Sequence, residues 1–245
     1  MTEKLLAEDI KERCAIFDEN FADVTARIEK AAALSGRKSD EIMLLAATKT
    51  ISVEVINHAI KNGIKLIGEN KVQELLSKID EYDSSADRHF IGHLQTNKVR
   101  QVVGKVSMIE SVDSFRLANE ISRRSEEMGI VTDILVEVNI GGEESKSGIK
   151  PEETESFLQE ISELKGIKVQ GLMTIPPICE KNEEILRYFE QMNNLFVDIS
   201  NKNIDNINMK YLSMGMSDDF EQAIICGANI VRVGTRLFGR RNYAV

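Results

Sequence analysis

The chain has 245 residues, of which 42% are hydrophobic and 29% charged, and its formal net charge is −9. This length suits one (β/α)8 barrel, and an acidic chain without a dense lysine and arginine block argues against nucleic acid or an anionic membrane as a partner. Three scattered cysteines form no disulfide framework, and neither a secretory leader nor a membrane-spanning apolar run is present, so we expect a cytoplasmic protein.

The first predicted element is a long amphipathic helix over residues 3–34. Apolar side chains recur there at spacings of three and four, and Ser35 and Gly36 end the pattern. We expect residues 1–36 to be a helical extension that precedes the rest of a single domain covering residues 1–245.

Strand and helix patterns alternate after this extension. The predicted strands are residues 42–47, 65–68, 89–93, 106–109, 134–138, 169–173, 211–214 and 230–233. Helices are expected to start at Ser52, at Asn70, after Thr96, at Asp113 or Ser114, at Pro151, at Glu183 and at Ser217. Alternation of this kind indicates parallel βαβ units, and eight units at this length favour a closed TIM barrel over an open sheet.

Two of the predicted strand ends carry charged side chains that suit a site at the barrel mouth. Lys49 follows the first strand, where low polarity disfavours its charged form and makes its amine a better nucleophile for an aldehyde. The alternative is a surface lysine just beyond a strand. Arg232 lies in the last strand and, with Gly234, is expected to face the barrel mouth, where it can pair with a pyridine nitrogen or with a strand-end carboxylate.

The last two strands end in glycine and hydroxyl residues. Ser213 and Met214 precede Gly215, and Gly234 precedes Thr235 at the start of a helical turn. Backbone N–H groups and hydroxyls at such positions bind phosphate, and barrels often hold phosphate in the loops after strands 7 and 8. A phosphate cradle opposite a strand-end lysine is what pyridoxal 5'-phosphate (PLP) requires.

Other strand ends give weaker signals. Asn70 follows the second strand and is either a helix N-cap or a ligand contact, and Met214 is placed to pack against a ligand ring. His89 and His93 could form a metal pair, but no Asp, Glu or Cys clusters beside them, so we expect no metal.

Together these segments resemble the pyridoxal phosphate homeostasis protein family, whose members are similar to the N-terminal barrel of alanine racemase. The matching segments are AATK at 46–49, GEN at 68–70 with QE at 73–74, HFIGHLQTNK at 89–98, VN at 138–139 with Glu144, Lys146 and Gly148, GLMT at 171–174, LSMGMS at 212–217 with Asp219, and VRVGT at 231–235 with FG at 238–239. The resemblance implies that Lys49 forms an imine with PLP. It also implies phosphate contacts from Ser213, Gly234 and Thr235, Arg232 at the pyridine nitrogen, and Asn70 and Met214 in the pocket.

The resemblance further implies a cofactor carrier that affects amino-acid and keto-acid balance. Related racemases have a second domain that supplies another acid or base, and this sequence ends six residues after Gly239. An arginine at the ring nitrogen disfavours its protonation and weakens the cofactor as an electron sink. We therefore expect a non-catalytic monomer that binds PLP and passes it to apo PLP-dependent enzymes. The alternatives are a weak amino-acid racemase and a class I aldolase that uses Lys49.

Overall fold

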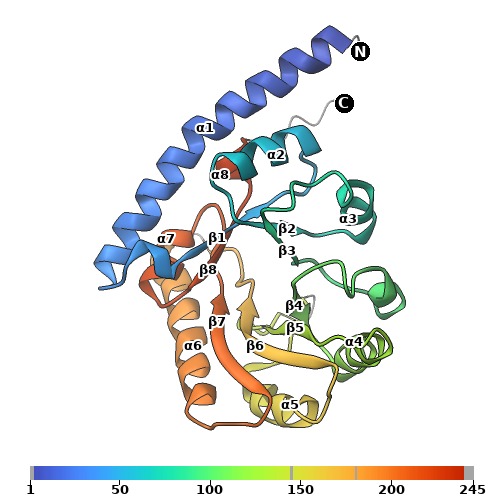
Figure 1. Cartoon of the computed structure of the whole chain (residues 1–245). Coiled ribbons are helices and arrows are strands. Elements are labelled where there is room, and N and C mark those ends of the chain that lie inside the picture. Colours follow the sequence, from blue (N-terminus) through green and yellow to red (C-terminus); the bar gives the residue numbers. More distant parts are fainter. Residues whose placement is uncertain (1–2, 144–145, 180, 240–245) are drawn as a thin grey trace.

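Eight parallel strands close into a barrel in the computed structural model, which describes residues 3–143, 146–179 and 181–239 (Figure 1). The strands are β1 (Met43–Ala47), β2 (Leu66–Glu69), β3 (Asp87–Phe90), β4 (Met108–Val112), β5 (Thr132–Val138), β6 (Ile167–Thr174), β7 (Ile207–Ser213) and β8 (Ile230–Val233). Each strand pairs with the next in sequence, and β8 pairs with β1 through the Leu45–Arg232 register. The predicted TIM barrel is confirmed.

Helices follow most of the strands and cover the outside of the barrel (Figure 1). They are α2 (Val53–Lys61), α3 (Val72–Lys78), α4 (Phe115–Glu127), α5 (Thr154–Ile161), α6 (Asn182–Ser200), α7 (Phe220–Ile225) and α8 (Thr235–Phe238), with short 3-10 turns η1 (Ser39–Glu41), η2 (Thr96–Gln101) and η3 (Pro151–Glu153). The helix predicted after Thr96 is therefore a 3-10 turn. The helix predicted from Ser217 begins three residues later, after its N-cap residue Asp219.

The N-terminal helix α1 (Glu3–Leu34) lies along the outside of the barrel against α2, α7 and α8 (Figure 1). Its apolar stripe is fully enclosed at Phe17, Val24 and Ala32, and burial of a Phe or Val side chain is worth about 1.5–3 kcal/mol. The predicted extension is thus part of the domain core.

The core has an outer layer and an inner layer because successive strand residues face opposite sides of a sheet. The outer layer, between strands and helices, contains Ala46, Ile67, Val231 and Val233. The barrel interior holds two smaller apolar clusters, one around Leu45 and the other around Leu135. Buried polar side chains share this interior, and they connect to the candidate site.

Candidate functional site

Three neighbouring strands bring the predicted site residues to one mouth of the barrel. Lys49 follows β1, Asn70 follows β2, and Gly234 and Thr235 follow β8, which lies on the other side of β1. These are the carboxyl ends of the strands, where barrel enzymes place their sites. The positions lie far apart in sequence, and the closure of the barrel by β8 brings them together.

A pocket joins the first and last strands at this mouth. Its lining residues are Ala47, Lys49, Thr50, Ile51, Gly234, Thr235, Phe238 and Gly239. The half-buried Lys49 therefore shares a pocket with the two predicted phosphate residues of β8. A side chain at Gly234 would place its Cβ 3.3 Å from the carbonyl oxygen of Ala47, so glycine keeps the two strand ends close.

The turn that carries Lys49 is held by a buried polar cluster. Thr50 has φ of 66° in the left-handed region, and its N–H donates to the Glu74 carboxylate. The hydroxyl of Thr48 donates to Glu69 Oε1 at 2.7 Å, and Lys78 Nζ contacts Thr48 O, Glu69 Oε1 and Glu74 Oε1 at 3.2, 3.1 and 2.7 Å. Because the residues on either side of Lys49 are bonded to β2 and α3, its backbone position is fixed.

A hydroxyl at the pocket edge comes from Ser217. Its Oγ accepts hydrogen bonds from the backbone N–H groups of Gly234 and Arg236, at 3.2 and 3.3 Å. Gly215, with φ of 92°, allows the loop after β7 to turn back over α7. Because the Ser217 oxygen accepts these two N–H groups, its own hydroxyl hydrogen is directed elsewhere and can be donated to an oxyanion at the pocket edge.

The barrel interior holds a buried cation beneath this mouth. Arg232 is 5% exposed, and it donates from Nη1 to Ser213 Oγ at 2.7 Å and from Nη2 to the carbonyl oxygen of Thr174 at 2.8 Å. Burial lowers the pKa of Arg232, and the carboxylates of Glu110, Glu137 and Asp219 oppose this change. The alternation prediction is confirmed for Arg232, which points into the barrel.

Ser213 and Met214 occupy places that differ from their predicted roles. The Ser213 hydroxyl is fully buried between Arg232 and Glu110, donating to Glu110 Oε2 at 2.6 Å. Met214 is fully buried within the outer apolar layer. This geometry does not support a phosphate contact from Ser213 or a ring contact from the Met214 side chain, because both side chains already fill other environments. The hydroxyl at the pocket edge belongs to Ser217, four residues further along.

Two acidic side chains inside the barrel were missed by sequence reasoning. Glu110, from β4, is fully buried, and it contacts His89 Nδ1 through Oε1 at 2.6 Å. Burial raises the pKa of Glu110, but hydrogen bonds and charge from His89, with smaller effects from Arg232 and Ser213, bring the pKa below its ordinary value. Burial raises the pKa of Glu137, and the nearby Asp113 carboxylate raises it further.

Asn70 presents an unused acceptor on the same rim. Its Oδ1 is buried and has no hydrogen-bond partner among the described residues. A buried polar atom without a partner costs free energy, so a ligand donor at this place would be stabilising. Gly92 packs directly against the backbone of Asn70: a Cβ atom added at Gly92 would collide with the Asn70 carbonyl group. This close contact holds the Asn70 backbone in place.

The two histidines of β3 and its following loop have separate partners. His89 contacts Glu110, whereas His93 is largely exposed and lies 3.4 Å from Asp113. Across the described ranges, no group of three or more metal-binding side chains comes together. Glu144, one residue of the sequence motifs, lies outside the described residues.

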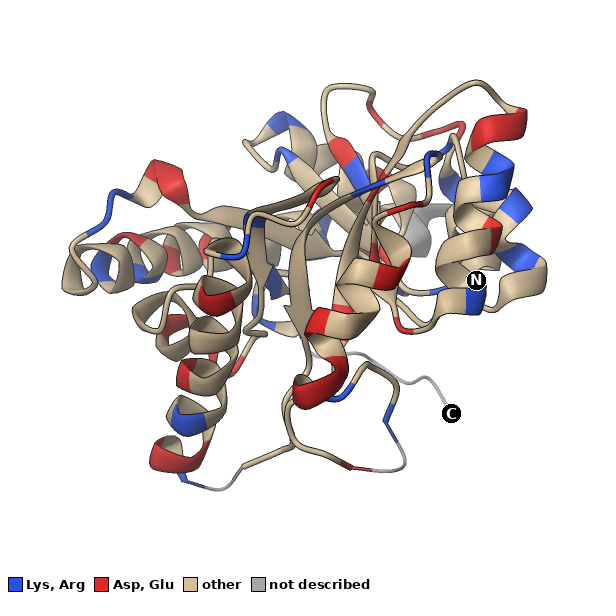
Figure 2. Cartoon of the chain, turned by 90° about the horizontal axis from the view of Figure 1, so that it is seen from below, with Lys and Arg blue, Asp and Glu red and all other residues tan. Residues whose placement is uncertain are grey.

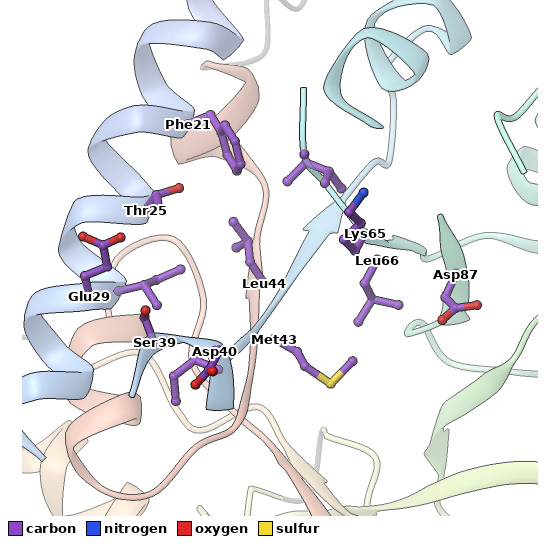
Figure 3. Close-up of a pocket in the computed structure, with 14 residues that line it drawn as sticks. Phe21, Thr25, Glu29, Ser39, Asp40, Met43, Leu44, Lys65, Leu66 and Asp87 are labelled. Carbon is purple, nitrogen blue, oxygen red and sulfur yellow. The ribbon is translucent and has the colours of Figure 1, made fainter. Parts of the chain in front are cut away.

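A larger pocket of about 420 Å³ lies at the opposite end of the barrel, between α1 and the starts of β1, β2 and β3 (Figure 3). Phe21, Leu44 and Leu66 face it, and Glu29 and Asp40 lie at its edge. Its lining is mostly apolar, and the predicted site residues lie at the other mouth. Charged residues of both signs are interspersed on the helices (Figure 2), and none of the described helices combines the length and apolar character needed to cross a bilayer.

Comparison with known proteins identifies the family. The profile of the alanine racemase N-terminal domain matches residues 20–242. The pyridoxal phosphate homeostasis protein of Aquifex aeolicus is 46% identical over 226 residues, covering 92% of this chain and 98% of the relative. The chain belongs to the pyridoxal phosphate homeostasis protein family. The member from Escherichia coli K12 is 35% identical over 229 residues, covering 92% of this chain and 97% of that protein.

Solved structures agree with this family and fold. A Synechococcus elongatus family protein, PipY, was solved with PLP bound; it is 29% identical, with a TM-score of 0.74, covering 87% of this chain and all of that one. A protein of unknown function from Bifidobacterium adolescentis is 38% identical, with a TM-score of 0.88, covering 93% and 96% of the two chains. Alanine racemase of Clostridium difficile, at 15% identity and a TM-score of 0.71 over 93% of this chain and 56% of its own, shares the fold.

Proposed function

We propose that this chain binds PLP at the mouth of its barrel, through an imine between Lys49 and the cofactor aldehyde, and acts in intracellular PLP homeostasis. The observation that carries the proposal is the pocket that Lys49 shares with Gly234 and Thr235. A PLP-bound structure of a relative and the names of the curated relatives support it.

The residues at this mouth fit the chemical groups of PLP. Thr235, through its hydroxyl and backbone N–H, and Ser217, through its hydroxyl hydrogen, would hold the phosphate beside Gly234, where the missing side chain leaves room for it. The unpartnered Oδ1 of Asn70 would accept a hydrogen bond from a ligand on the β2 side. Ser217 would thus take the phosphate role that the family resemblance implied for Ser213.

Arg232 would contact the pyridine nitrogen. It lies two residues before Gly234 on β8 and faces the barrel interior, and the bonds to Ser213 and Thr174 leave further N–H groups of a guanidinium for another acceptor. A guanidinium donates its hydrogen and does not give up its proton to a weakly basic ring nitrogen.

This contact favours a carrier over an enzyme. PLP supplies an electrophilic aldehyde and acts as a strong electron sink only when its ring nitrogen is protonated. Arg232 would keep that nitrogen unprotonated, so amino-acid chemistry at this site would be slow. A Lys49 imine remains open to exchange with another amine, which allows PLP to leave. The role we propose is therefore a cytoplasmic, monomeric carrier that holds PLP and releases it to apo enzymes.

The experiment is an absorbance titration of the purified protein with PLP. Wild type should develop the visible band of a protein-bound imine, Lys49→Ala should lose it, and Lys71→Ala, at an exposed lysine on the same rim, should keep it. The loaded wild type, mixed with an apo PLP enzyme, should restore that enzyme's activity. Retention of the band in Lys49→Ala would disprove the imine assignment, and failure to release PLP to any apo enzyme or free amine would disprove the carrier role.

A further inference from the structure

A continuous hydrogen-bonded chain crosses the inside of the barrel from Arg232 to His89. Arg232 on β8 donates to Ser213 on β7 at 2.7 Å, and Ser213 donates to Glu110 on β4 at 2.6 Å. Glu110 contacts His89 on β3 at 2.6 Å. Strands β4 and β7 are separated by β5 and β6, so the Ser213–Glu110 bond crosses the barrel interior between strands that do not pair.

The chemistry of the donors fixes the direction of every bond. Arg232 can only donate, so Ser213 accepts its hydrogen and must donate its own hydroxyl hydrogen to Glu110 Oε2. Glu110 therefore accepts at Oε2, and with its pKa below the ordinary value it is a carboxylate. A carboxylate accepts from both sides, so the hydrogen between Glu110 and His89 belongs to Nδ1 of His89.

His89 is the last residue of this series of hydrogen bonds, and it lies toward the barrel mouth opposite the proposed PLP site. It is 5% exposed and lines a cavity of about 170 Å³ together with Met43, Asp87, Met108 and Asp133. All four of these lie at or next to the first residue of their strands. Lys210 and Tyr211 are the other ionisable groups of this cavity. The hydrogen bonds thus connect Arg232 to a cavity at the amino-terminal end of the barrel.

The other side chains inside the barrel are mostly apolar. The apolar cluster around Leu45 and Ile230 and the cluster around Met108 and Leu135 fill other parts of the barrel interior. Electrostatic interactions among buried, hydrogen-bonded groups are stronger than in water. Glu110 and Arg232 form no direct ion pair. The Ser213 hydroxyl lies between them and is hydrogen-bonded to both.

We propose that His89 and Glu110 are positioning residues for Arg232, and that they couple the pyridine-nitrogen end of the PLP site to the opposite mouth of the barrel. The inference rests on the proposed function, because it takes PLP as the ligand of Arg232. A ligand acceptor at Arg232 redistributes the hydrogen bonds of the guanidinium. Ser213 and Glu110 then transmit this change to the Nδ1–H of His89.

The test is nitrogen NMR of histidine-labelled protein, with and without PLP. The chain has three histidines, and His58 on α2, away from the proposed PLP site, serves as the internal reference. We expect the hydrogen of His89 on Nδ1 in the free protein, and a shift of its ring signals when PLP binds, with no shift at His58. The Ser213→Ala variant should still bind PLP, as read by absorbance, yet lose the His89 response.

The outcomes separate this inference from the proposed function. If PLP gives no imine band, the proposed function fails, whereas the tautomer of His89 still tests the hydrogen-bond chain. If PLP binds and the His89 signals do not move, or if the hydrogen is on Nε2, the coupling is wrong. Should Ser213→Ala not fold, His89→Leu replaces it: the absorption maximum of bound PLP should differ from wild type, and His93→Leu should leave it unchanged. An unchanged maximum in His89→Leu would overturn the proposal.

Discussion

Replacement of Glu110 by glutamine tests how far the buried charges of the barrel depend on one another. Glutamine has nearly the same volume as glutamate, so the substitution creates no cavity that would itself lower the stability. The amide has a single acceptor oxygen where the carboxylate accepts from both His89 and Ser213 at 2.6 Å. Arg232, which is buried, also loses the nearby negative charge of Glu110.

Loss of one partner from a buried charge pair costs about 3–5 kcal/mol. For a chain of this size each kcal/mol shifts Tm by about 2–4 °C, so the variant should melt roughly 6–20 °C lower. The loss should depend on pH. Because folding lowers the pKa of Glu110, its stabilisation is complete above the ordinary carboxyl pKa of about 4.3 and disappears as the pH falls through the folded value.

The assay is urea unfolding at neutral pH and at successively lower pH. The free-energy difference between wild type and Glu110→Gln should be constant from about pH 7 to pH 5 and shrink below about pH 4. Glu152→Gln, at an exposed position, is the control and should change stability by less than about 0.5 kcal/mol. A neutral-pH loss of less than about 1 kcal/mol, or a loss that grows on acidification, would refute the reasoning.

Three further predictions concern the same mouth of the barrel. Burial and the Asp113 carboxylate raise the pKa of Glu137, so the charged form of Glu137 lowers the stability of the fold once the pH exceeds that pKa. Glu137→Gln should therefore unfold at a higher urea concentration than wild type at pH 7, and this difference should disappear near about pH 4. A variant less stable than wild type at pH 7 would contradict this. Ser217→Ala should weaken PLP by about 1.5–3 kcal/mol in calorimetry while pyridoxal, which lacks the phosphate, is bound as before; equal losses would place the phosphate elsewhere. Alanine racemisation, followed by chiral chromatography, should barely exceed the rate with free PLP, and turnover of about 1–1000 per second would restore the racemase alternative.

The sequence was sufficient for the barrel because its strands are short apolar runs separated by helical segments. The predicted bounds of the third to seventh strands were less accurate, and the third strand is Asp87–Phe90 where residues 89–93 were predicted. β7 begins at Ile207, four residues before the predicted start, because exposed Asn208 and Lys210 alternate with less exposed residues in its first half. β4 extends past Ile109 to Val112 and includes Glu110, whose charge interrupts the apolar pattern although the side chain is buried.

The residues of the candidate site could be brought forward from sequence only where local sequence carries the signal. Lys49, Gly234 and Thr235 follow apolar strands directly, and the structure places all three around one pocket. The bond between Ser213 and Glu110 could not be predicted, because the two residues are 103 positions apart and meet across the barrel interior. No spacing rule reports which inward side chains of opposite strands will meet.

The assignment of Ser213 shows a different limit. Both serines of the LSMGMS segment lie at or just after the end of the predicted seventh strand, and composition alone does not separate them. The structure separates them because the strand continues through Ser213, which turns its side chain into the barrel, whereas Ser217 lies beyond the glycine turn beside Gly234.

The most direct test of the account is the position of the covalent link to PLP. Borohydride reduction of the PLP-loaded protein, followed by proteolysis and peptide mass mapping, should place the pyridoxyl group on Lys49 and on no other lysine at high occupancy. The physical reason is that Lys49 alone among the described lysines lines the pocket with Gly234 and Thr235. A label found instead on Lys71, Lys98 or Lys146, with Lys49 unmodified, would contradict the central claim.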